Sequence, residues 1–179
     1  MINKLICKCK KATFSFHTIK DIPLLIDDKE EEVPLISLIE NYFKNEIVDY
    51  EEKCIFCNKI YPHEKITSII NLPEILILSL QRFNPVTREK KNTKVMFDTI
   101  LNINPFVDET IKDQSNCTYN LFGVINHEGT LDFGHYYSYV KIKSKDVWYK
   151  FNDSLVESKG KNIKFDFTKV YILFYYKNK

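Results

Sequence analysis

Tyr119-Asn-Leu-Phe-Gly-Val-Ile-Asn-His127, Gly134-His-Tyr-Tyr-Ser-Tyr-Val140 and Trp148-Tyr-Lys-Phe-Asn-Asp-Ser154 are the three segments that decide the fold of this chain. Each alternates or runs apolar like a strand of an antiparallel sheet, and its aromatic content suits such strands. His135 begins the second strand, and Ser144-Lys-Asp146 can turn the chain so that the third strand returns beside it. We therefore predict that Asn152 lies close to His135 across one hairpin.

This pairing of a histidine with an amide has a chemical use. An oxygen that accepts a hydrogen bond from one ring N–H fixes the tautomer, so that the other nitrogen can take a proton from a thiol. Asn152 or Asp153 can supply that oxygen. The alternative is that His135 is a strand-end histidine satisfied by the backbone. The aromatic run behind it and the Trp-Tyr-x-Phe-Asn-Asp return favour a catalytic histidine.

The rest of the chain is also rich in strand patterns. We predict further strands at 1–6, 12–19, 22–26, 65–71, 74–83, 93–103 and 170–176. Segment 74–83 is almost wholly aliphatic, which predicts a strand buried on both faces. Apolar residues recur at helical spacing in Pro34–Lys44, which predicts an amphipathic helix. One helix and about ten strands indicate the α+β class, with strands dominant.

Composition excludes several classes of protein. A net charge of +2 argues against a dedicated nucleic-acid binder. No apolar run approaches the about 20 residues of a membrane span, and the N-terminus has no signal-peptide pattern. We therefore expect a cytoplasmic or nuclear protein that binds neither nucleic acid nor membrane. The acidic segment Asp27–Glu32 and the basic segment Arg88–Lys94 are expected to be a solvated loop and a surface hairpin tip.

Four of the five cysteines form two close pairs, Cys7-x-Cys9 and Cys54-x-x-Cys57. In a chain without a secretory pattern, such pairs indicate a metal site rather than disulfides. Four thiolates suit a structural zinc ion, and residues i and i+2 of a strand share a face, so Cys7 and Cys9 can both chelate if the backbone bends. The alternative is four reduced cysteines left from a decayed site.

Taken together, these segments resemble the ubiquitin-specific proteases, a family of papain-like deubiquitinases. The three segments quoted first resemble the histidine box of that family. Its other strand motifs are matched in order by Leu72-Pro-Glu-Ile-Leu-Ile-Leu-Ser-Leu-Gln-Arg-Phe83, Lys91-Asn-Thr-Lys-Val-Met-Phe97 and Val170-Tyr-Ile-Leu-Phe-Tyr175. The helix followed by Cys54-x-x-Cys57 stands where the family has its small helix and second zinc pair. The resemblance covers essentially the whole chain.

The resemblance implies a partial papain-like cysteine protease fold, with antiparallel β palm and fingers and without the thumb. The chain would be a single partial catalytic domain, residues 1–179. Its first part, up to about residue 70, would form the fingers with the cysteine pairs, and the remainder would form the palm with the histidine box. Structural zinc at Cys7, Cys9, Cys54 and Cys57 would tie the fingertips together.

The resemblance also implies roles for individual residues. His135 resembles the catalytic base, Asn152 the third member of the triad, and Asp153 a residue that assists near the oxyanion. His127 would lie beside the groove for the ubiquitin tail, with Gly134 and Tyr136. An alternative for His127 is a hydrogen-bonding loop residue.

One part of the family pattern has no counterpart in this sequence. The cysteine box, which carries the nucleophile and an oxyanion-hole amide, is not matched, and Cys117 stands on the wrong side of the order, so we interpret it as structural. The leading hypothesis is the C-terminal portion of a thiol-dependent deubiquitinase, inactive alone, whose partners are ubiquitin, ubiquitinated proteins and the N-terminal cysteine-bearing half of the domain. It would be a truncated chain, half of a split enzyme or a degenerate homologue. The alternatives are a non-catalytic ubiquitin-binding scaffold and a zinc domain unrelated to ubiquitin.

Overall fold

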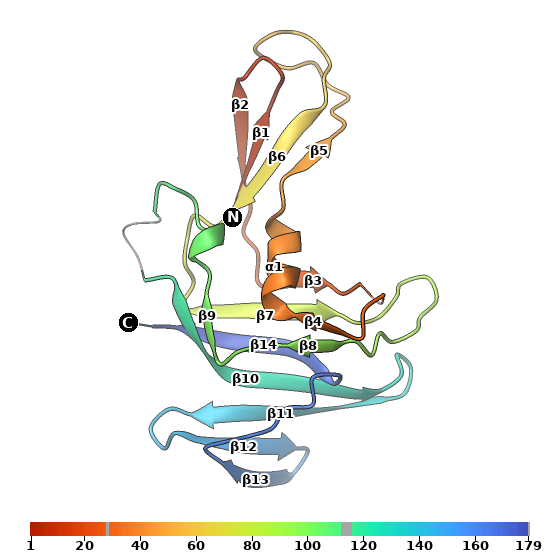
Figure 1. Cartoon of the computed structure of the whole chain (residues 1–179), viewed down its shortest axis with the longest axis vertical. Helices are drawn as coiled ribbons and strands as arrows, with labels where there is room; N and C mark the ends of the chain where they lie inside the picture. Colours follow the sequence, from red (N-terminus) through yellow and green to blue (C-terminus); the bar gives the residue numbers. More distant parts are fainter. Residues whose placement is uncertain (28, 112–115, 179) are drawn as a thin grey trace.

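The computed structural model describes residues 1–27, 29–111 and 116–178, arranged as two β-sheets joined end to end (Figure 1). A four-stranded sheet forms the narrow upper part in the order β2-β1-β6-β5. Its strands are β1 (Ile2–Ile6), β2 (Ala12–Phe16), β5 (Glu46–Val48) and β6 (His63–Ser68). All three pairings are antiparallel.

The eight-stranded sheet forms the broad lower part and contains the His135–Asn152 hairpin. Its main path runs β13-β12-β11-β10-β14-β7-β3, and β9 pairs with β10 beside that path. These strands are β3 (Ile22–Leu25), β7 (Ile75–Gln81), β9 (Ile100–Asn102), β10 (Thr118–Gly129), β11 (Gly134–Ile142), β12 (Val147–Asn152), β13 (Leu155–Gly160) and β14 (Val170–Lys177). Among the described strands of this sheet, β3 and β7 form the one parallel pair.

Four smaller elements complete the described part of the chain. The strands β4 (Glu32–Pro34) and β8 (Lys94–Met96) form a short parallel pair. They are accompanied by the helix α1 (Leu35–Phe43) and the 3-10 helix η1 (Asn104–Phe106). Among the described residues, no helix is both long and apolar enough to cross a membrane.

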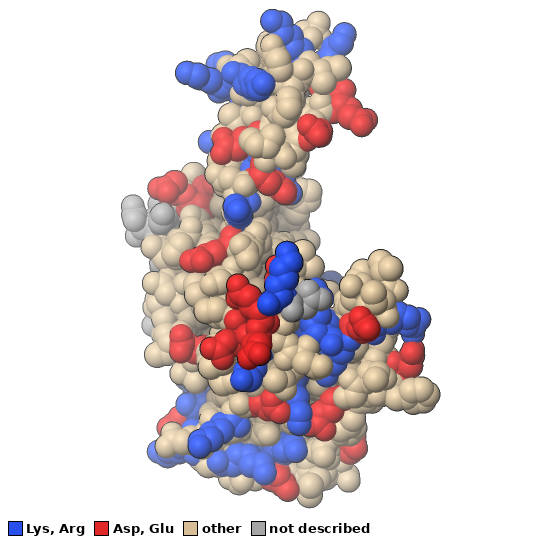
Figure 2. Space-filling view, turned by 45° about the vertical axis from the view of Figure 1, so that its right-hand side comes forward, with Lys and Arg blue, Asp and Glu red and all other residues tan. Residues whose placement is uncertain are grey.

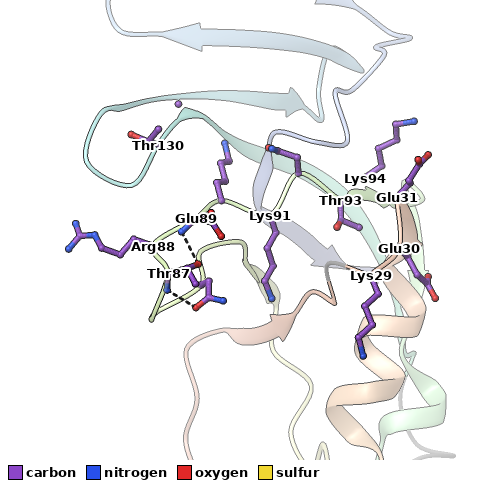
Figure 3. Close-up of a pocket in the computed structure, with 14 residues that line it drawn as sticks. Lys29, Glu30, Glu31, Thr87, Arg88, Glu89, Lys91, Thr93, Lys94 and Thr130 are labelled. Atoms are coloured by element: carbon purple, nitrogen blue, oxygen red, sulfur yellow. Dashed lines mark hydrogen bonds between the residues drawn. The ribbon is translucent and has the colours of Figure 1, made fainter.

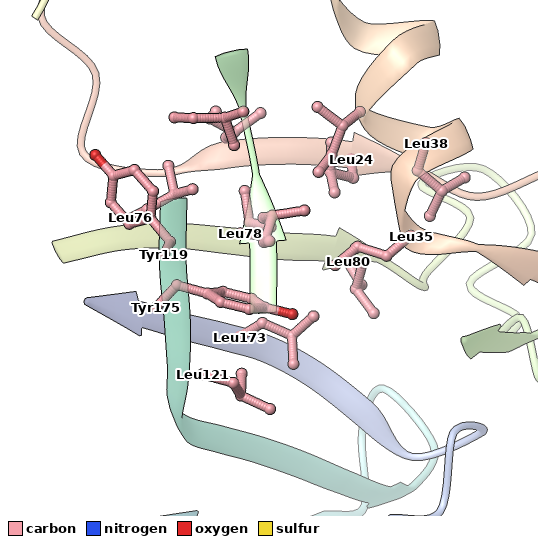
Figure 4. Close-up of a cluster of buried hydrophobic side chains, with 14 of the residues drawn as sticks. Leu24, Leu35, Leu38, Leu76, Leu78, Leu80, Tyr119, Leu121, Leu173 and Tyr175 are labelled. Atoms are coloured by element: carbon pink, nitrogen blue, oxygen red, sulfur yellow. The ribbon is translucent and has the colours of Figure 1, made fainter. Parts of the chain in front are cut away.

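The main core lies on one face of the eight-stranded sheet, beneath α1. Alternate side chains of β7 point into it, as the period of a strand requires, and Leu78 is fully buried (Figure 4). β14 adds Leu173 and Tyr175, and α1 adds Leu35 and Leu38. The buried hydroxyls are satisfied, since Tyr175 donates a hydrogen bond to the Asp98 carbonyl over 2.8 Å.

The α+β class, the single helix and most of the strands agree with the sequence-based predictions. The prediction that 74–83 is buried on both faces is wrong, because Ile77 and Ser79 are only half-buried and Ile75 is exposed. Segment 93–103 is two strands, β8 and β9, which pair with different partners. The acidic segment is not all loop, because Glu32 begins β4.

The two sheets do not divide the chain at one point. Strands of the smaller sheet lie on both sides of the segment 22–43, whose β3 and α1 pack on the larger sheet. The chain therefore passes from the small sheet to the large one and returns before β6. The expected division near residue 70 into fingers and palm stays a prediction, since β3 and α1, which precede residue 70, pack on the large sheet.

Candidate active site and cysteine cluster

The β11–β12 hairpin brings His135 and Asn152 together. Its register runs from Ile142 opposite Val147 to Ser138 opposite Phe151, so the two site residues stand at its open end. His135 Nε2 lies 2.5 Å from Asn152 Oδ1. Because an amide oxygen only accepts, the ring must donate through Nε2–H. The side chains therefore meet as the hairpin pattern predicts.

Asp153 stands beside this pair at the tip of the next hairpin. Asn152 pairs with Leu155, so Asp153 and Ser154 form a two-residue turn, and Asp153 has a φ of 50°. Aspartate tolerates this left-handed conformation better than most residues. Its Oδ2 lies 4.0 Å from His135 Nε2, and its side chain is 81% exposed. The carboxylate thus lies beside the ring without forming the primary hydrogen bond.

The second ring nitrogen of His135 is available for chemistry. Nδ1 makes no hydrogen bond to any residue that the structure describes, and the side chain is 46% exposed. With the proton on Nε2, Nδ1 carries a lone pair. The geometry is that of a base that can accept a proton from an approaching acid.

The predicted groove residues His127, Gly134 and Tyr136 also come together. His127 lies on β10 opposite Tyr136, and their ring centroids are 4.6 Å apart. His127 is buried, with Phe83 and Tyr171 completing an aromatic cluster, whereas Tyr136 is 52% exposed. The alternative of a hydrogen-bonding loop residue is wrong for His127, since it belongs to a strand and its Nδ1 has no partner in the described chain. Burial, together with the nearby Lys90 ammonium, lowers the pKa of His127 and keeps it neutral.

Three charged residues near the site were not predicted from the sequence. Glu128 stands directly opposite His135 in the ladder and accepts a bond from Lys169 Nζ over 2.5 Å. This bond lowers the pKa of Glu128 and raises that of Lys169. Lys90 Nζ donates to the His127 carbonyl over 2.5 Å. These contacts join segments distant in sequence, so no local pattern reports them.

A groove of about 950 Å³ opens beside the loop that leads to His135 (Figure 3). Lys29, Glu30 and Glu31 line one side, and the turn 84–89 lines the other. Arg88 forms an ion pair with Asp132, which joins this turn to the loop between β10 and β11. The prediction of a surface hairpin tip at Arg88–Lys94 is only partly right. The exposed turn lies earlier, at 84–89, and is closed by the bridge between Phe83 and Lys90, whereas Thr93 is buried and Lys94 begins β8.

The four paired cysteines meet at the tip of the small sheet. Cys7 and Cys57 have sulfurs 3.9 Å apart, Cys9 and Cys54 have sulfurs 3.8 Å apart, and all four lie within 4.8 Å of one another. A tetrahedral zinc site with bonds of about 2.3 Å requires sulfurs about 3.8 Å apart. The cluster therefore has the dimensions of a four-thiolate metal site.

Both cysteine pairs sit in turns rather than on strands. β1 ends before Cys7, and a bond of 2.8 Å from the Lys10 amide to the Cys7 carbonyl closes the turn, with Lys10 at a φ of 64°. In the second turn, the Asn58 amide donates to the Cys54 carbonyl over 2.8 Å, and Asn58 has a φ of 56°. The expectation that Cys7 and Cys9 share a strand face is therefore wrong, and the turn supplies the required bend.

The sulfurs of the cluster differ in their tendency to ionise. Backbone amides of Phe56 and Cys57 point at Cys54 and lower its pKa to about 6. Although the Cys9 amide opposes the change, burial and the neighbouring sulfurs raise the pKa of Cys7 to about 12. Lysines gather at this tip (Figure 2), and those that flank the cysteines are exposed: Lys8, Lys10, Lys11, Lys53 and Lys59. Four thiolates at this spacing need a positive ion between them.

Cys117 belongs neither to the His135–Asn152 pair nor to the cysteine cluster. It is 6% exposed and belongs to the main hydrophobic core, next to the start of β10. The cysteine cluster is at the far end of the small sheet from the β11–β12 hairpin (Figure 1).

Comparison with known proteins identifies the family. The family model described as ubiquitin carboxyl-terminal hydrolase matches residues 1–175. Ubiquitin carboxyl-terminal hydrolase 8 of Saccharomyces cerevisiae is 32% identical over 149 residues, which are 77% of this chain and 31% of that protein. Ubiquitin carboxyl-terminal hydrolase 7 of the same yeast is 36% identical over 135 residues, 64% of this chain and 12% of that protein. The chain thus spans less than a third of the length of these two relatives.

Solved structures agree with the family match. The SAGA DUB module Ubp8/Sgf11/Sus1/Sgf73 bound to monoubiquitin contains a chain that matches 99% of this one with a TM-score of 0.82 and 28% identity. The match covers 40% of that chain. The same module bound to ubiquitin aldehyde gives a TM-score of 0.81 and 29% identity. The sequence, the fold and these relatives show that the chain belongs to the ubiquitin carboxyl-terminal hydrolase family, the deubiquitinases of the ubiquitin-specific protease type.

Proposed function

We propose that this chain supplies the general-base side of a thiol-dependent deubiquitinase, which hydrolyses the isopeptide or peptide bond after the C-terminal glycine of ubiquitin. The observation that carries the proposal is the bond of 2.5 Å between His135 Nε2 and Asn152 Oδ1, in a side chain that is 46% exposed and whose Nδ1 has no hydrogen-bond partner among the described residues. A thiol hydrolase needs a histidine held in this manner.

Each residue of the pair has a defined role in this chemistry. His135 Nδ1 takes the proton of the attacking thiol and later returns a proton to the leaving amine. Asn152 holds the ring and its tautomer while Nδ1 works. Asp153 assists by favouring the imidazolium that forms after proton transfer, from 4.0 Å. Near the oxyanion its contribution would pass through a bridging water, because a carboxylate repels a second anion.

The nucleophile in this proposal is a cysteine outside these 179 residues. Four of the five cysteines belong to the cluster, and Cys117 is buried in the core. We therefore expect no hydrolysis by this chain alone, and full activity only together with the cysteine-bearing half of the domain.

Ubiquitin is the proposed partner. Support comes from the two solved structures of the related SAGA DUB module, which is bound to monoubiquitin in one and to ubiquitin aldehyde in the other. The exposed ring of Tyr136, above His127 and next to Gly134, would form one wall of a narrow groove for the ubiquitin tail. A tail that ends in glycine fits between aromatic rings because it has no side chains there.

We further propose that Cys7, Cys9, Cys54 and Cys57 bind one zinc ion with a structural role. The sulfur spacing and the two turns support this assignment. Zinc has no redox chemistry and would close the tip of the small sheet by joining its two turns. Reduced cysteines of this kind suit the cytoplasm or the nucleus, which is where we propose that the protein acts.

A ubiquitin derivative with an electrophile at its C-terminus tests the function. With the present chain we expect saturable binding and no covalent adduct. With a longer product of the same gene that includes the upstream reading frame, we expect an adduct at an upstream cysteine, which is lost in His135→Ala. Binding without an adduct in the longer product would instead support the non-catalytic scaffold, and the absence of binding in both would contradict either function.

A further inference from the structure

Arg82 is a buried cation for which neither the proton-transfer chemistry nor the cysteine cluster has a use. It follows β7 directly and is 0% exposed. No carboxylate of the described residues lies within ion-pair distance of it. Burial lowers the pKa of Arg82 to about 10, against a weaker opposing effect of Asp166. A buried charge without an ion-pair partner requires hydrogen bonds that offset its lost hydration.

Four backbone carbonyls supply these hydrogen bonds. Arg82 Nε donates to Val170 O over 2.5 Å, and Nη2 donates to Phe167 O over 2.8 Å. Nη1 donates to Thr93 O over 2.8 Å and to Lys91 O over 3.0 Å. The guanidinium therefore fastens two segments, 91–93 and 167–170, that lie far apart in the sequence.

The backbone of His127 is held on both sides. The 167–170 segment binds its N–H, and Lys90, which directly precedes the 91–93 segment, binds its carbonyl. Within the 167–170 segment, the Lys169 carbonyl accepts from the His127 amide over 2.9 Å. Next to the 91–93 segment, Lys90 Nζ donates to the His127 carbonyl over 2.5 Å. The pairing of β14 with β10 ends at Val170, which stands opposite Asn126. The two bonds to the His127 backbone therefore hold the end of β10 beyond its last pair with β14.

From His127 the connection continues to His135. The ring of His127 lies against the backbone of Gly134, which has no room for a Cβ. Glu128, the next residue of β10, stands opposite His135 and is held by Lys169 Nζ over 2.5 Å. The end of β10 therefore sets the place of the first residues of β11.

We propose that Arg82 is a positioning residue for the His135–Asn152 pair, acting through the two segments that clamp the end of β10. It touches no reacting group. The role assigned to His135 rests on the proposed function, whereas the mechanical connection is a property of this chain alone. Lysine cannot replace Arg82, because one ammonium cannot reach carbonyls on both segments in a planar fork.

The experiment measures the ring N–H protons of the four histidines by ¹⁵N-edited NMR in the present chain. In the unchanged chain we expect a protected Nε2–H at His135, from its bond to Asn152. In Arg82→Met and Arg82→Lys, we expect its exchange with water to become about tenfold faster, the effect of losing one hydrogen bond. His63, whose Nδ1–H bonds to the Tyr61 carbonyl in the small sheet, is the internal reference and should not change.

Leu78→Ala is the matched control, because it damages the core on the same strand without touching the clamps. If it loosens His135 as much as Arg82→Met does, Arg82 is only a core residue and the inference is wrong. Should Arg82→Met fail to fold, the half-exposed Lys90→Met and Lys169→Met decide, since they remove the side-chain bonds of these lysines to the His127 carbonyl and to Glu128. An unchanged His135 signal in their double variant overturns the inference. If His135 in the unchanged chain shows no protected Nε2–H, that result contradicts the proposed function, before any substitution is tested.

Discussion

The imidazole of His127 occupies the space that a side chain at Gly134 would need. A Cβ built on Gly134 would lie 2.0 Å from His127 Nε2 and 2.9 Å from the Glu128 carbonyl oxygen. Gly134 does not have a positive φ, so its requirement for glycine is steric rather than conformational. Because Gly134 immediately precedes His135, this contact sets the approach of the backbone to the base.

Replacement of Gly134 by alanine should therefore displace β10 from β11 at the site. We expect Gly134→Ala to lower the free energy of unfolding by about 1–3 kcal/mol, the usual cost of overpacking. The measurement is urea unfolding. Since the closest clash is with the His127 ring, His127→Ala/Gly134→Ala should lose less than the sum of the two single variants. Additive losses would show that the His127 contact is not the cause.

Ser138→Ala is the control for this series. Ser138 lies on the same strand, is half-buried and makes no side-chain hydrogen bond to a described residue. Its replacement should change the free energy of unfolding by no more than about 0.5 kcal/mol.

The β11–β12 hairpin could be predicted from the sequence because its information is local. The strands have strong alternation, and the turn at 143–146 contains Asp146 at a φ of 51°. A hairpin with known ends fixes which residues face each other, so the meeting of His135 with Asn152 follows from the register.

The strands that were missed lack such local information. β4 and β5 have three residues each, too few for a period to show. β13 is mostly exposed and pairs only with β12, so it has no buried face to mark it. The clamps of Arg82, Lys90 and Lys169 are contacts between distant segments, which only the assembled sheet defines.

The buried neutral His127 predicts a pH dependence of stability. Its pKa is lowered in the folded chain by burial and by Lys90, so the folded state binds a proton less readily than the unfolded state. The stability is therefore complete above the unfolded pKa of about 6.5 and is lost as the pH falls through the folded value. We expect urea unfolding at pH 7.5 and pH 5.5 (about one unit to either side of 6.5) to show lower stability at the lower pH.

His127→Phe should flatten that part of the pH dependence, because the ring remains and the titration is removed. The exposed His17 provides the comparison, and His17→Gln should keep the full slope. A slope that persists unchanged in His127→Phe would assign the effect to another group.

Removal of the metal should affect the two sheets unequally. We expect native mass spectrometry to find one zinc ion per chain, which is lost in Cys54→Ser and retained in Cys117→Ala. Without zinc, the turns at Cys7 and Cys54 lose their cross-link, so hydrogen exchange should accelerate in β1 and β6 and remain unchanged in β10 and β14. Zinc retained in Cys54→Ser, or equal acceleration in both sheets, would contradict a structural site at the tip.

The proposed roles of His135 and Asn152 can be separated by kinetics in a longer gene product that forms the expected adduct with the ubiquitin probe. His135→Ala should lower kcat for a fluorogenic ubiquitin C-terminal amide by about 10²–10⁴-fold, the range of a lost general base. Asn152→Ala keeps the base but frees its ring, so a smaller loss is expected, and Asn152→Asp should recover most of the rate because it keeps an oxygen acceptor for Nε2–H. Lys143→Ala, in the turn at the other end of the hairpin, is the control and should leave kcat unchanged. If Asn152→Ala matches the control, the hydrogen bond of 2.5 Å does not orient the base, and Asp153 at 4.0 Å becomes the candidate for that role.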